Sequence, residues 1–191
     1  MLNLVTGYRG TAHVTADEEA LKNLMTFSNF HVTENGDQLG YTLMSNNQLR
    51  IKSGDLMVQG RFVRLENYED VTIENGTQEM QRIDLVCLRY TKDSGTGIES
   101  VALVAIKGAE SAAAAEVPAH NEGIIVDGDS PVDFPLYTVT LDGLNVTEVK
   151  ALFEVSKNIQ EQISSYTYGT EDLTAGVSEL AEGKLHFVYE A

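Results

Sequence analysis

The feature that most constrains the fold is a pair of apolar runs, residues 79–92 and 98–108, joined by the short segment DSGTG. The glycines of this connection, Gly95 and Gly97, predict a β-hairpin whose tip lies there. In the first run the alternating side chains are apolar on both faces: Ile83, Leu85 and Cys87 on one, Val86 and Leu88 on the other. We therefore expect this strand to be central in its sheet and covered on both faces.

The same run carries two charged residues, Arg82 and Asp84, on one face of the expected strand. No nucleophilic residue accompanies them, so an active site is the weaker interpretation. We expect a structural ion pair that is buried or half-buried.

Residues 30–75 alternate with a period of two and are divided by Gly, Asn and Asp, which predicts a meander of short strands. Its stretch GDLMVQGRFVRL invites comparison with a phosphate-binding loop, which needs four residues between its glycines and then Lys and Ser or Thr. Here five residues separate Gly54 from Gly60, and Arg61 and Phe62 follow. We interpret Gly54 as a strand end and Gly60 as a bend or bulge. Arg61 is then expected to pair with a carboxylate, and Gly60 to tolerate substitution less than Arg61.

Two helices are predicted. The first covers residues 15–27, with Thr15 and Glu18 forming a capping box. Its expected buried stripe consists of four residues: Ala20, Leu21, Leu24 and Met25. The second covers residues 147–166, with Thr147 as a candidate cap. Its apolar stripe, which we expect to mediate self-association, consists of Leu152, Val155, Ile159 and Ile163.

These elements predict a mainly β (α+β) protein: an antiparallel β-sandwich-like domain with an N-terminal helix and a C-terminal amphipathic helix. We expect a β-rich domain over residues 1–145. Residues 146–191 would hold the second helix and a terminal strand, KLHFVYE, and would form an oligomerisation segment. That strand needs a sheet edge, from this chain or from a neighbouring one.

The charge balance excludes one class of function. With 29 acidic and 13 basic residues the formal net charge is −16, which argues against an autonomous nucleic-acid-binding protein.

The single cysteine, Cys87, excludes an internal disulfide and a cysteine-rich zinc site. No apolar run approaches the ~20 residues of a membrane span and no secretory signal is evident, so we expect the protein to be made and folded in a cytoplasm.

We expect no cofactor and no metal site. The four histidines, His13, His31, His120 and His186, fall on different elements without metal-ligand spacing. Three aspartates in a long excursion, Asp127, Asp129 and Asp133, suggest a calcium site, but the EF-hand pattern is absent. A solvated turn is the favoured interpretation of these acids.

Several segments together, TGYRGTAHVTADEEALKNLM, SNNQLRIKSGDLMVQGRFVRL, VTIENGTQEMQRIDLVCLRYTKDSGTGIESVALVAIKG and DFPLYTVTLDGLNV, resemble tail-module proteins of siphophages and prophages of Gram-positive bacteria. The resemblance covers roughly residues 6 to 150 and carries no catalytic signature. It implies a non-enzymatic virion protein of the tail tip or baseplate that supports host attachment and is usually a homotrimer. Within TGYRGTAHVT, residues Tyr8, Arg9 and His13 are the expected contacts with a neighbouring tail protein.

Two other functions remain open. The first is a receptor-binding adhesin that recognises host cell-wall polysaccharide through tyrosines and acidic residues, since the chain has eight tyrosines. The second is a small hydrolase of the cell wall, for which the sequence offers no recognisable catalytic motif.

Overall fold

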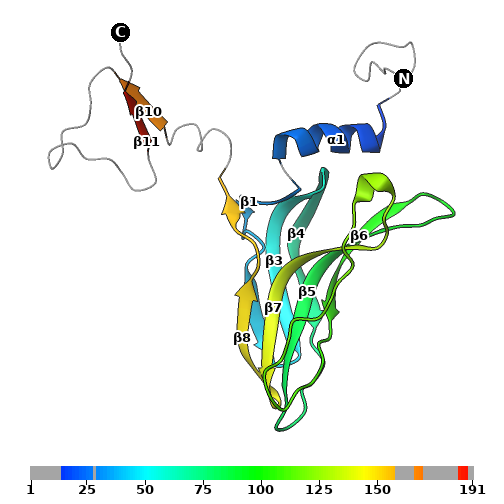
Figure 1. Cartoon of the computed structure of the whole chain (residues 1–191), viewed down its shortest axis with the longest axis vertical. Helices are drawn as coiled ribbons and strands as arrows, with labels where there is room; N and C mark the ends of the chain where they lie inside the picture. Colours follow the sequence, from blue (N-terminus) through cyan, green and yellow to red (C-terminus); the bar gives the residue numbers. More distant parts are fainter. Residues whose placement is uncertain (1–13, 28, 158–165, 170–184, 189–191) are drawn as a thin grey trace. The chain divides into compact units, whose positions relative to one another are not determined.

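The computed structural model describes residues 14–27, 29–157, 166–169 and 185–188. The chain divides into two compact units, Met1–Val155 and Ser156–Ala191. The first unit, called the β domain below, contains two antiparallel sheets and one α-helix in its described part (Figure 1). The prediction of a mainly β protein is confirmed.

One sheet is built around a single long strand, β3 (Gln48–Val58). On one side β3 pairs along its whole length with β4 (Arg61–Thr72). On the other side its first half pairs with β2 (Tyr41–Ser45) and its second half with β1 (Phe30–Gly36). The short β9 (Val155–Ser156) follows β1 in the sheet order.

The expectation that Gly54 ends a strand is wrong. Gly54 lies within β3, at an irregularity where Lys52 pairs with Tyr68 but Gly54 pairs with Leu65. Between these two pairs, Ser53 of β3 faces both Glu66 and Asn67 of β4. This extra residue is a β-bulge in β4. The glycine permits the bend, and the main-chain ladder resumes beyond it, so the separate strands expected from the turn residues merge into one.

The other sheet has the strand order β6-β5-β7-β8. Its members are β5 (Gln81–Lys92), β6 (Glu99–Ile106), β7 (Val132–Asp142) and β8 (Asn145–Ala151). The predicted hairpin is confirmed as β5 and β6, with Gly97 at a positive φ of 72° in the connection. β5 lies between β6 and β7 and is buried on both faces from Asp84 to Leu88, as predicted.

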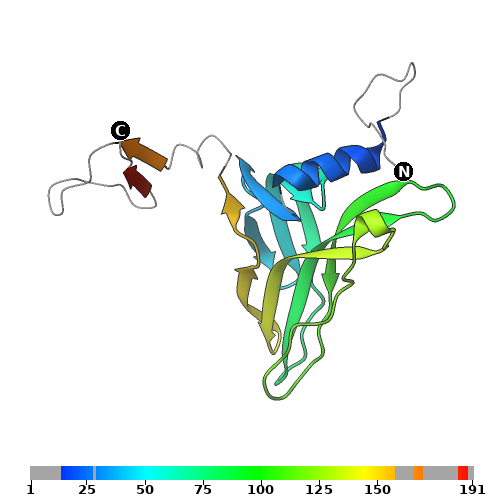
Figure 2. The same cartoon turned by 45° about the horizontal axis from the view of Figure 1, so that its top comes forward.

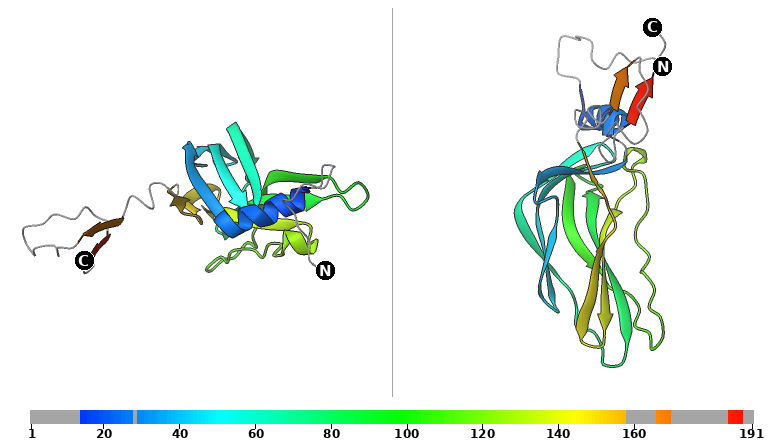
Figure 3. Two further views of the ribbon diagram at one scale, coloured as in Figure 1. Left: turned by 90° about the horizontal axis from the view of Figure 1, so that it is seen from above. Right: turned by 90° about the vertical axis from the view of Figure 1, so that its left-hand side faces the viewer.

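The two sheets face each other across one apolar core (Figure 3). The core combines Val32, Leu49, Ile51, Leu56 and Val58 from the first sheet with Val86, Leu88, Leu136, Val139 and Leu141 from the second. Tyr137 adds a buried link between the sheets, because its hydroxyl donates to the carbonyl of Leu39 at 2.6 Å. A short 3₁₀ turn, η1 (Ile125–Asp127), adds Ile125 to the core.

The predicted first helix is confirmed as α1 (Ala16–Phe27), which lies across one end of the β domain (Figures 1 and 2). Its capping box is present: the N–H of Glu18 donates to Thr15 Oγ1, and the N–H of Thr15 donates to the Glu18 carboxylate. The predicted buried stripe is wrong in part. Ala20 is buried, but Leu21 is 43% and Met25 is 90% exposed, because α1 is held at the turn between β3 and β4 and does not pack on a sheet face.

The predicted second helix is wrong over its described part. Residues 145–151 form β8, residues 152–154 are irregular and residues 155–156 form β9. Leu152 and Val155 are exposed, while the neighbouring Phe153 packs edge-to-face on Tyr137 at 5.4 Å between ring centroids. Ile159 and Ile163 lie outside the described residues. The expected domain boundary, between residues 145 and 146, falls within β8, which is paired with β7 in one sheet.

In the second unit the described residues form two short parallel strands, β10 (Tyr166–Gly169) and β11 (Leu185–Val188). The predicted terminal strand therefore contains β11. Its partner edge is β10 of the same chain.

Candidate functional site

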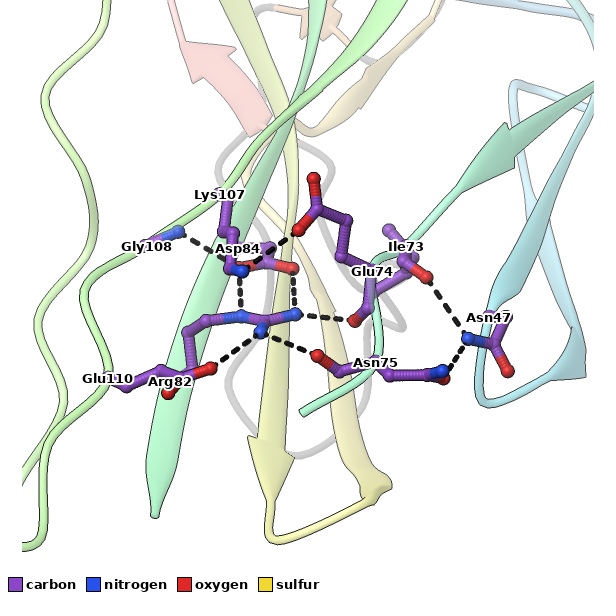
Figure 4. Close-up of polar contacts among 9 residues, drawn as sticks. All are labelled: Asn47, Ile73, Glu74, Asn75, Arg82, Asp84, Lys107, Gly108 and Glu110. Atoms are coloured by element: carbon purple, nitrogen blue, oxygen red, sulfur yellow. Dashed lines mark hydrogen bonds and ion pairs between the residues drawn. The ribbon is translucent and has the colours of Figure 1, made fainter. Parts of the chain in front are cut away.

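Arg82 is the centre of a buried polar network where β5 begins (Figure 4). Its side chain is 1% exposed and forms a bidentate ion pair with Asp84, with N–O distances of 2.7 and 2.9 Å. The same guanidinium donates to the carbonyls of Glu74 and Asn75 and to the carboxylate of Glu110. All five N–H groups therefore have acceptors, which offsets the loss of hydration.

This network joins three segments of the chain. Asp84 also accepts a hydrogen bond from the N–H of Gly108 at 2.9 Å, just after β6. Burial lowers the pKa of Arg82, but the hydrogen bonds and charges of Asp84 and Glu110 raise it by more, so the guanidinium stays charged. The structure thus places the expected pair Arg82 and Asp84 together as a clamp between β5, the segment after β4 and the segment after β6.

A second buried carboxylate, Asp133 in β7, holds the long excursion between β6 and β7. It accepts two hydrogen bonds from Arg89, at 2.6 and 3.0 Å, and two from the backbone and side chain of Asn121. Burial raises the pKa of Asp133, and these hydrogen bonds lower it by more, so the net shift is downward. The expectation that Asp133 lies in a solvated turn is wrong, because it is a buried strand residue with a structural role.

α1 is anchored on the turn between β3 and β4. Gly60 in this turn has a φ of +82°, and a Cβ atom built on it would lie 1.9 Å from the carbonyl oxygen of Ala20. The side-chain amide of Asn23 donates to the carbonyl of Gly60 at 3.0 Å. The close approach of helix and turn therefore requires glycine at this position.

Arg61, the next residue, links α1 to β6. Its guanidinium donates to Asp17 in α1 and, at 2.9 and 3.3 Å, to the carboxylate of Glu99 in β6. Burial lowers the pKa of Arg61, and the two carboxylates raise it by more. Arg61 therefore pairs with carboxylates, as the sequence led us to expect.

An apolar surface surrounds this anchor. We call it the α1 surface; it consists of Leu21, Leu24 and Met25 of α1 with Ile124 and Val126 near η1. Between the helix and η1 it is hollowed by about 260 Å³, with Asn29, Gln59 and Arg61 completing the lining. Exposed apolar side chains gathered around a hollow are typical of a surface that binds another protein.

The neighbourhood of the α1 surface is acidic. The first turn of α1 contains Asp17, Glu18 and Glu19, and Asp127 and Asp129 follow Val126 in the chain. Lys22 is the exposed cation of the described part of α1, and it pairs with Glu19 at 3.1 Å. A partner that covers the α1 surface would therefore be favoured by basic residues around an apolar centre.

A second hollow lies at the β-bulge in β4. We call it the bulge groove; it comprises two adjoining hollows of about 390 and 560 Å³ that share Ser53 and Glu66. The lining residues are mostly polar: Asn35, Gly36, Asp37, Ser53, Gly54, Asp55, Arg64, Leu65, Glu66, Asn67 and Tyr68. No pattern in the sequence indicates this groove, because it arises where the bulge brings β4 beside the turn after β1.

One wall of the bulge groove is fixed by the ion pair of Asp55 and Arg64. Both N–O distances are 2.8 Å, and Asn35 donates a third hydrogen bond to Asp55 at 3.1 Å. The hydrogen bond from Arg64 lowers the pKa of Asp55, and the bond from Asn35 adds to this effect. The carboxylate therefore stays ionised and keeps the wall in place.

Other side chains of the described residues do not assemble into a metal centre. No group of three or more His, Cys, Asp or Glu residues in that part of the chain could hold a metal ion. Cys87 is buried within β5, and burial raises the pKa of its thiol to about 12, so it is protonated near neutral pH. In the described part of the chain, no helix is long and apolar enough to span a membrane.

The residues expected to make assembly contacts are not brought together in the described structure. Tyr8, Arg9 and His13 lie outside the described residues, as do Ile159 and Ile163. The chain matches no protein-family model, and a search of the curated proteins found no match to it.

Proposed function

We propose that this chain is a non-enzymatic structural protein of a phage tail tip or baseplate, and that the α1 surface binds a neighbouring tail protein. The observation that carries this proposal is the exposure of Leu21 and Met25 on a helix that is fixed to the β domain. A helix held by Gly60, Asn23 and Arg61 loses little further freedom on binding, so its exposed apolar side chains are preorganised for a partner.

The position of α1 in the chain supports the same proposal. The segment TGYRGTAHVT, expected from the resemblance to contact a neighbouring tail protein, directly precedes α1. The acidic residues around the α1 surface would repel an identical surface, so we propose a different, basic protein as the partner here. In this proposal the protein is virion-located, has a β-sandwich-like domain, and forms a homotrimer.

The test is binding of the purified full-length chain to each protein encoded beside it among the tail genes, measured by biolayer interferometry. The double variant Leu21→Ser and Met25→Ser should weaken binding by at least about tenfold, because each loses apolar burial at the contact. A high-salt buffer should slow association, because the acidic neighbourhood attracts the partner at long range.

The matched control is Leu144→Ser. Leu144 is 56% exposed and lies in the turn between β7 and β8, at the other end of the β domain from α1 (Figure 1). This variant should bind like the parent chain. Failure of the parent chain to bind any of these tail proteins, or equal binding by the double variant, would contradict the proposal.

A further inference from the structure

The bulge groove contains an aromatic ring with an arginine stacked on one face. Tyr68 is 55% exposed, and the guanidinium of Arg50 lies 3.7 Å from the centre of its ring. Arg50 is itself held by two hydrogen bonds to Asp70, at 2.7 and 2.8 Å. Arg50 therefore covers one face of the ring, and the ring lines the groove.

The polar groups beside Tyr68 are of two kinds. Some are already fixed, since Ser53 donates to Asp37 at 2.6 Å across the groove. Others, the side chains of Glu66 and Asn67, make no hydrogen bond to any residue that the structure describes. They are exposed on the bulge, where a carboxylate and an amide offer paired donors and acceptors to an incoming ligand.

We propose that the bulge groove binds a neutral saccharide. A pyranose ring has an apolar C–H face, which suits the exposed face of Tyr68, and edge hydroxyls that donate and accept, which suit Glu66 and Asn67. The groove is open and shallow enough for a sugar within a longer chain. This proposal rests on the groove alone and does not depend on the α1 surface or on the proposed tail partner.

The charges argue for a neutral saccharide over an anionic polymer. Asp37 and Glu66 are acidic lining residues, and Arg64, the basic residue in the lining, is already paired with Asp55. The whole chain has a net charge of −16, which repels polyanions further. A phosphate-rich polymer would therefore be disfavoured both within the groove and at long range.

The experiment uses the full chain and an array of neutral hexose and N-acetylhexosamine oligosaccharides, with poly(glycerol phosphate) as the anionic probe. The strongest neutral ligand is then titrated by calorimetry against variants. Tyr68→Ala should lower affinity by about tenfold or more, and Tyr68→Phe, which keeps the ring, should retain most of it. Asn67→Ala should weaken binding by several-fold through the loss of a hydrogen-bonding group.

Phe62→Ala is the matched control. Phe62 lies on the same strand, is equally exposed at 55%, and has its own cation, Arg64, at 5.5 Å, but it does not line the groove. This variant should bind like the parent chain, and circular dichroism should show that every variant is folded. Three results would each overturn the proposal: no binding to any neutral saccharide, binding to poly(glycerol phosphate) alone, or equal losses for Tyr68→Ala and Phe62→Ala.

Discussion

At the scale of single residues, burial separates two arginine–aspartate pairs that have the same geometry. Arg82 and Asp84 are almost fully buried, whereas Arg50 and Asp70 are 28% and 26% exposed. Both pairs are bidentate. Water therefore competes for the second pair and not for the first, so the two pairs should differ in their contribution to stability.

We predict that Arg82→Lys lowers the free energy of unfolding by about 2–4 kcal/mol, because lysine keeps the charge but has only three N–H donors. The carbonyls of Glu74 and Asn75 would then compete with Asp84 for donors. The measurement is urea-induced unfolding followed by circular dichroism.

The matched variant is Arg50→Lys, which should lower the unfolding free energy much less than Arg82→Lys does, because its pair is solvated. Equal effects of the two substitutions would show that the Arg82 network is not a clamp, and that burial does not set its contribution.

At the scale of elements, the docking of α1 depends on one close contact with the turn between β3 and β4. We predict that Gly60→Ala lowers the unfolding free energy by about 2–4 kcal/mol. The Cβ would add the strain of a positive φ to a collision with the backbone of Ala20. Hydrogen exchange should also show faster opening of α1, because the helix must move away from the turn.

Gly97→Ala separates the two causes. Gly97 also has a positive φ, of 72°, but a Cβ there would have nothing within 4 Å. Its substitution should cost only about 1 kcal/mol, from backbone strain alone. Arg61→Ala should also be milder than Gly60→Ala, and the reverse order would refute the close-contact explanation.

The elements also show how far the sequence can be interpreted. α1 and its capping box could be predicted, because the residues that satisfy the first N–H groups of a helix are local. The hairpin of β5 and β6 could be predicted for the same reason, since the glycines of its turn and the alternation of its strands lie within one short segment.

The sequence did not reveal β8 as a strand, because a bulge interrupts its alternation. The predicted helix rested instead on Leu152, Val155, Ile159 and Ile163, which all follow β8 in the chain. Leu141 pairs with Val146, but Thr140 pairs with Glu148, so the ladder skips Thr147. Val146 and Val149, three residues apart, consequently both pack against the core. A spacing of three is the mark of a helix in sequence, and only the partner strand reveals that it belongs to a bulged strand.

The bulge groove was hidden for a related reason. Its lining residues come from three separate segments, around Asn35, Ser53 and Glu66, and the irregular pairing of β3 with β4 brings them together. No short-range sequence pattern indicates that these three segments lie side by side. Tyr68 was visible in the sequence only as one of eight tyrosines.

At the scale of the whole molecule, the net charge is −16, and each of the two sheets contains an aspartate that forms an ion pair with an arginine. Asp55 in β3 and Asp133 in β7 both have pKa values below the ordinary range for aspartate. Hydrogen bonds from Arg64 hold the first, and those from Arg89 and Asn121 outweigh burial in the second. Both carboxylates bind protons more readily in the unfolded chain than in the folded one, so acid favours unfolding at both sites.

We predict that the free energy of unfolding is insensitive to these two groups above about pH 5 and falls as the pH drops through their folded pKa values, below the unfolded value of about 3.9.

The variant Asp55→Asn tests whether Asp55 contributes to this pH dependence. At about pH 7 the variant should be less stable than the parent chain, and the difference should shrink as the pH falls through the folded pKa of Asp55, where the parent's carboxylate takes up its proton too. Self-repulsion among the other acids changes almost equally in both proteins, so the difference between them isolates Asp55. A gap between Asp55→Asn and the parent that stays constant across the titration would show that the pair with Arg64 does not contribute through ionisation.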